Sequence, residues 1–70
     1  MNHKTFSHVL ATAASRAETV GMEPASGKQC WFLAKLLLDD GDDGSDWVLD
    51  TSRILTKKQA STRISELVGK

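Results

Sequence analysis

The sequence contains a single cysteine, a single proline and no tyrosine, and none of its apolar runs approaches the length of a membrane span. One cysteine cannot form an intrachain disulfide, and a chain without a cysteine framework is typical of a reducing compartment. A membrane span needs about 18 apolar residues in succession, and the first residues lack the basic start and apolar core of a signal peptide. We therefore expect a cytoplasmic protein that does not associate with membranes.

The chain also lacks an excess of either charge, because nine Lys and Arg balance nine Asp and Glu. The charges are unevenly distributed along it. Residues 39–50 hold six Asp and no cation, whereas residues 51–70 hold five Lys or Arg and one Glu. The net charge says nothing about partners, but this distribution predicts an electrically polarised molecule.

Motifs of catalysis and metal binding are missing as well. The serines lie in no nucleophile motif, and the chain has no glycine-rich phosphate loop. His3 and His8 lack the i, i+4 spacing that places two metal ligands on one face of a helix. The Asp cluster fits no register of the EF-hand calcium loop. We expect no enzyme activity, no cofactor and no metal.

Residues 1–70 predict one small all-α domain, since 40% of the residues are hydrophobic and 26% are charged, as in ordinary folded proteins. The first helix is expected at about 5–20, with Thr5 as its N-cap and Gly21 just past its end. Its apolar stripe follows helical spacing. The stripe consists of Phe6, Val9, Leu10, Ala13, Ala14, Ala17 and Val20.

Two capping boxes lie thirty positions apart and predict two further helices, at about 26–39 and 56–68. In each, a Ser or Thr cap is followed three residues later by Gln, which reaches back to the cap's N–H. The helix at 26–39 is apolar on nearly all sides, which predicts a central position between the other two. We expect a long solvated acidic loop after it, with Trp47-Val48-Leu49 as an irregular or single-turn 3₁₀ segment.

The capped segments carry the patterns Ser-x-Lys-Gln-x-x-Phe-Leu-x-x-Leu at 26–36 and Leu-Thr-Lys-x-Gln-Ala-Ser-x-x-Ile-x-x-Leu at 55–67. Together they resemble a small bacterial and phage helix-loop-helix module of unknown function, over about residues 24–69. Its usual form reads KQxx(F/Y)(L/I) and then LTKxEASxxIxxL, with Glu where this chain has Gln59. The resemblance implies a role in nucleic-acid metabolism and supplies no catalytic residues.

Five basic residues are the candidate anion-binding or nucleic-acid-binding site. If the two helix starts converge, their N–H groups and these cations would form a site of phosphate size. The alternative is a solvated basic surface without a ligand. The five are Lys28, Arg53, Lys57, Lys58 and Arg63.

A second set of residues is the candidate surface for a protein partner. Its aromatic members would either fill the core or form a binding patch, and its acidic members would either form a flexible loop or imitate phosphate charge. The set consists of Trp31, Leu38, Asp42, Asp43, Asp46 and Trp47.

These observations predict a non-enzymatic interaction module, of the kind that phages or mobile elements encode, acting on nucleic-acid machinery. Binding to the DNA or RNA backbone is the first mechanism to consider. The alternatives are a protein-binding inhibitor of a host defence or transcription complex, similar in action to anti-CRISPR proteins, and a homodimeric structural module.

Overall fold

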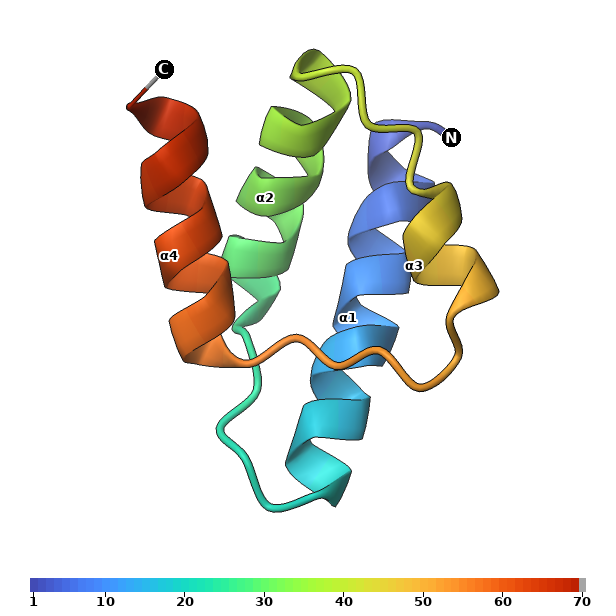
Figure 1. The fold of residues 1–70 in the computed structure, drawn as a ribbon, viewed down its shortest axis with the longest axis vertical. Helices are drawn as coiled ribbons and strands as arrows, with labels where there is room; N and C mark the ends of the chain where they lie inside the picture. The colour runs from blue at the N-terminus through green and yellow to red at the C-terminus, as the bar shows by residue number, and fades with distance from the viewer. Residues whose placement is uncertain (70) are drawn as a thin grey trace.

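Residues 1–69, which the computed structural model describes, form four α-helices and no strand (Figure 1). The helices are α1 (His3–Thr19), α2 (Gly27–Asp39), α3 (Ser45–Leu49) and α4 (Lys57–Val68). The expected all-α class is therefore confirmed. None of these helices is long and apolar enough to cross a membrane.

The α2 helix is central, as its sequence predicts, with α1 on one side and α4 on the other (Figure 1). Phe6 and Leu10 of α1 meet Leu33 of α2 in the core, and all three side chains are completely buried. The α4 helix contributes less, since Ala60 and Leu67 are its only buried residues among those described. Helix α4 therefore buries the fewest residues of the three long helices.

Helix α1 begins two residues earlier than the spacing of apolar residues predicts. Asn2, and not Thr5, is its N-cap, and the Asn2 side chain accepts a hydrogen bond from the Thr5 N–H over 2.7 Å. The expected glycine at the other end is confirmed. Gly21 has a φ of +82°, and the N–H of Met22 donates to Ala17 O over 3.0 Å, which closes a Schellman motif.

Both capping boxes are present, and the helices they begin have the expected bounds to within one residue. Ser26 Oγ accepts from the Gln29 N–H over 3.1 Å, and Gln29 Oε1 accepts from the Ser26 N–H over 3.0 Å. The corresponding distances at Thr56 and Gln59 are 3.1 and 2.9 Å. The N-terminal signals in the sequence therefore placed α2 and α4 correctly.

The acidic segment differs from the expected long loop, because residues 45–49 form the helix α3 and raise the number of helices from three to four. Two Asp side chains order the turn before it: Asp42 accepts from the Gly44 N–H over 2.8 Å, and Asp43 accepts from the Ser45 N–H over 2.9 Å. Gly44 adopts a φ of +79°. Buried Trp47 then anchors α3 to the core. Repulsion among the Asp side chains alone predicts an open loop, but the burial of Trp47 favours a helix.

Candidate anion-binding site

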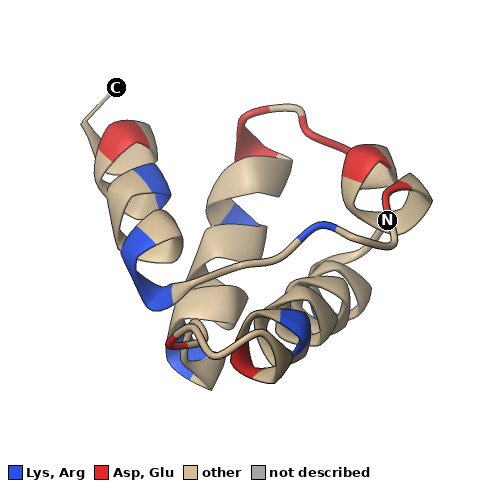
Figure 2. Cartoon of the chain, turned by 60° about the horizontal axis from the view of Figure 1, so that its bottom comes forward, with Lys and Arg blue, Asp and Glu red and all other residues tan. Residues whose placement is uncertain are grey.

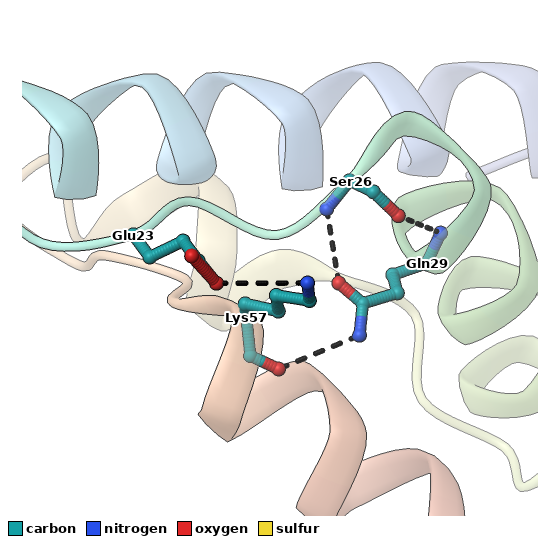
Figure 3. A network of polar contacts seen from close by, with 4 residues as sticks. All are labelled: Glu23, Ser26, Gln29 and Lys57. Carbon is teal, nitrogen blue, oxygen red and sulfur yellow. Dashed lines mark hydrogen bonds and ion pairs between the residues drawn. The ribbon is translucent and has the colours of Figure 1, made fainter.

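The starts of α2 and α4 lie side by side, held by the backbone just before each helix. The Ala25 N–H donates to Leu55 O over 3.2 Å, and the Lys57 N–H donates to Glu23 O over 2.9 Å. Gln29 adds a third link, since its Nε2 donates to Lys57 O over 3.4 Å (Figure 3). The two capped helix starts therefore do converge.

Backbone N–H groups at the two helix starts already have hydrogen-bond acceptors within the protein. The side chains of each capping box and the carbonyl of Glu23 take up N–H groups at both starts. The Glu23 carboxylate lies 3.6 Å from Lys57 Nζ, and both side chains are exposed (Figure 3). A carboxylate beside the helix start repels an incoming phosphate, so this corner is a poor place for the predicted anion site.

A groove of about 460 Å³ lies between α2, α4 and residues 50–56, and it collects basic side chains. Arg53 comes from the segment before α4, and Lys58 and Arg63 come from α4 itself. The groove also has apolar lining residues. These are Leu33, Leu37, Trp47, Ile54 and Leu55.

Arg53 is held in place by the residues around it. Its guanidinium carbon lies 3.9 Å from the centre of the Trp47 ring, a cation–π contact. Its backbone carbonyl accepts from Arg16 Nη1 over 2.9 Å, and its N–H donates to Asp50 O over 3.3 Å. Arg53 therefore enters the groove from an ordered segment, although it lies outside any helix.

Two acids share the groove with the three cations. Asp42 is half-buried there, and Glu66 lies 3.9 Å from Arg63 Nη1, measured at its Oε2. Lys58 makes no ion pair with any of residues 1–69. Figure 2 shows basic residues on α4 and on the segment before it, and acidic residues at the end of α2, in the next loop and on α3. The groove thus lies where the two charged regions meet.

The chain matches no protein-family model, no curated protein and no solved structure.

The structure brings together three of the five basic residues that the sequence singles out. Arg53, Lys58 and Arg63 line the groove, whereas Lys57 is paired with Glu23. Lys28 is exposed on α2 and lies outside the groove. The candidate site is therefore smaller than the predicted set.

The predicted protein-partner residues are dispersed. Trp47 is buried and Asp42 half-buried in the groove, as described above, and Leu38 is half-buried against the core. Asp43 and Asp46 are exposed near the start of α3. Trp31 is 52% exposed on α2, so only one of the two tryptophans belongs to the core.

Two functional candidates were not singled out in the sequence. Phe32 is 46% exposed on α2, and Lys35 is exposed beside it. The signal was available, since residues 28, 31, 32 and 35 have the i, i+3, i+4, i+7 spacing of one helix face.

Cys30 is buried in the core, and burial raises the pKa of its thiol. No three His, Cys, Asp or Glu side chains in residues 1–69 lie close enough together to hold a metal ion.

Proposed function

We propose that this protein is a non-enzymatic binding module that holds the phosphate backbone of DNA or RNA in the groove between α2, α4 and residues 50–56. One observation supports the proposal above the others: Arg53, Lys58 and Arg63 line the same groove although they come from two different segments. The guanidinium group of an arginine can donate two parallel hydrogen bonds to one phosphate, and the ammonium group of Lys58 adds a mobile point charge.

Binding of this kind has a salt dependence that reports the number of phosphates contacted. For duplex DNA, the slope of log K against log salt is about −0.9 for each phosphate contact. Asp42 and Glu66 in the same groove oppose the binding of an anion and make it weaker than on a purely basic surface. We therefore expect modest affinity and a slope no steeper than about −2.7, which corresponds to three phosphate contacts.

The test is a titration of a fluorescently labelled DNA duplex at several salt concentrations, followed by anisotropy. Replacing Lys58 and Arg63 with Gln removes two contacts and should lower the steepness of the slope by about 1.8. Lys4→Gln is a matched control, because Lys4 is exposed on α1 and outside the groove. Affinity and slope that stay unchanged in the double variant would overturn the proposal.

A protein partner is the second candidate, and the apolar lining of the groove favours it. A nucleic-acid backbone makes no use of Ile54, which is the half-buried apolar residue of the lining, whereas an acidic protein segment with one apolar side chain would contact both Ile54 and the cations. This candidate fits an inhibitor of a defence or transcription complex. Capture of a partner from nuclease-treated lysate by the wild type, with loss of capture in the Lys58 and Arg63 double variant, would favour it over the first.

A further inference from the structure

The outer face of α2 carries two exposed aromatic side chains between two lysines. Trp31 is 52% exposed and Phe32 is 46% exposed, and Lys28 and Lys35 lie one turn to either side. Their spacing places all four on one face of the helix. Leu33 and Leu37 of the same helix point into the core and line the groove, so the four residues form a separate surface.

The charge of this surface is positive. Neither Lys28 nor Lys35 forms an ion pair with any of residues 1–69. The acid on the same face, Asp39, lies at the last position of α2, one turn beyond Lys35. The lysines are seven residues apart, or about 10 Å along the helix axis. A negatively charged chain that runs along α2 would meet both of them.

Trp31 contacts α1 through His3. The ring of His3 lies 3.9 Å from that of Trp31, centre to centre, at an interplanar angle of 35°. His3 Nε2 also donates to the Trp31 carbonyl oxygen over 2.7 Å. An aromatic ring that already contacts a neighbour loses less conformational entropy when a ligand stacks on it.

We propose that this face of α2 binds single-stranded nucleic acid, with bases stacked on Trp31 and Phe32 and phosphates contacted by Lys28 and Lys35. Exposed aromatics beside cations are the combination that unpaired strands need, since every base has a face that can stack. A duplex keeps those faces inside its own stack. This surface is independent of the groove and distinguishes strand from duplex, which the groove cations do not.

A second copy of the chain fits this face less well. A stable interface buries about 800 Å² on each partner, and two half-exposed aromatic side chains fall well short of that area. A two-fold axis through the face would also bring the lysines of the two copies together. Charge complementarity therefore favours a polyanion, and the exposed aromatic rings favour one that carries bases.

The experiment measures the affinity of the full chain for a labelled oligothymidine of 12 nucleotides and for a duplex of equal length, using fluorescence anisotropy. Trp31→Ala should weaken oligothymidine binding about 5- to 150-fold, the effect of losing one stacked base, and should leave duplex binding unchanged. Replacing Lys28 and Lys35 with Gln should lower the steepness of the salt slope by about 1.4. Leu49→Ala, at an exposed apolar position of α3, is the matched control and should change neither oligothymidine binding nor duplex binding.

Four further measurements separate this proposal from its competitors. Trp31→Ala should still weaken oligothymidine binding when it is combined with the Lys58 and Arg63 double variant, so that a failure of the groove and a failure of α2 are distinguishable. Wild-type affinity in both Trp31→Ala and Phe32→Ala, with native circular dichroism, would overturn the stacking. Competition by inorganic polyphosphate as effective as that by oligothymidine would overturn it too, as would sedimentation showing a dimer that Trp31→Ala dissociates.

Discussion

Arg53 covers Trp47: the guanidinium carbon lies 3.9 Å from the centre of the indole ring, and the indole is only 9% exposed. This contact joins the groove to the core. Arg53 is a candidate phosphate ligand on one side and part of the packing of α3 on the other. A change at this position should therefore affect both stability and binding.

Arg53→Ala should lower the free energy of unfolding by about 0.5–1 kcal/mol, because the cation–π contact at this exposed arginine is lost. Urea denaturation followed by circular dichroism measures the change. Arg63→Ala is the control, since Arg63 lines the same groove and is not stacked on a ring. Its cost should stay within about 0.5 kcal/mol, and an equal loss in both variants would contradict the role given to Trp47.

Gly44→Ala should destabilise the protein more than Gly41→Ala. Both glycines have positive φ, at +79° and +89°, so both substitutions carry a backbone strain of about 1–2 kcal/mol. At Gly44, a Cβ would also lie 3.2 Å from Met1 Sδ and 3.3 Å from Phe6 Cε2, whereas at Gly41 nothing lies within 4 Å. Thermal unfolding of the two variants compares them directly. Equal melting temperatures would show that the space around Gly44 adapts at no cost.

Gln59→Glu should stabilise the protein by about 0.3–1 kcal/mol, because a carboxylate at the third helical position keeps the capping acceptor and interacts favourably with the helix dipole. Gln29→Glu should gain less. Its Nε2 donates to Lys57 O, and the substitution would place a second acceptor there. Denaturation of both variants measures the difference, and a Gln29→Glu variant that gains as much as Gln59→Glu would show that the bond to Lys57 contributes nothing.

Acid should reduce stability through two carboxylates with lowered pKa values. Hydrogen bonds from Ser45, first from its backbone and then from its side chain, lower the pKa of Asp43. Hydrogen bonds from the Ser52 hydroxyl and N–H lower that of Asp50. The unfolded chain then binds protons first, at an ordinary pKa of about 3.9. The contribution of both residues is present above that pH and is lost as the pH falls through their folded-state pKa values.

Titration of the carboxyl carbons by NMR measures these two pKa values directly. Ser52→Ala removes the hydroxyl donor at Asp50 and leaves the bonds at Asp43 intact, so only the Asp50 midpoint should rise. Midpoints of both residues at the ordinary value in the wild type would mean that the turns before α3 and before Arg53 are not ordered by these side chains.

The helices with strong local signals were predictable from the sequence, and the groove was not. The two capping boxes depend on residues three apart, so α2 and α4 were placed almost to the residue. Helix α3 has only five residues, too few for an apolar period, and its stability depends on Trp47 reaching the core. Arg53 lies between helices, and only the folded chain brings it to Lys58. Exposure of Trp31 likewise depends on how α1 packs against α2.

Gln29 also has a consequence for the order in which the chain folds. Its Oε1 completes the cap of α2, and its Nε2 reaches the carbonyl of the first residue of α4 (Figure 3). A helix of 12 residues is marginal in isolation, and α4 has few buried contacts to support it. Its first residue is bonded to Gln29, the side chain that also caps α2. We therefore expect α2 to nucleate before α4, and the amide hydrogens of α4 to exchange more slowly at its start than at its end.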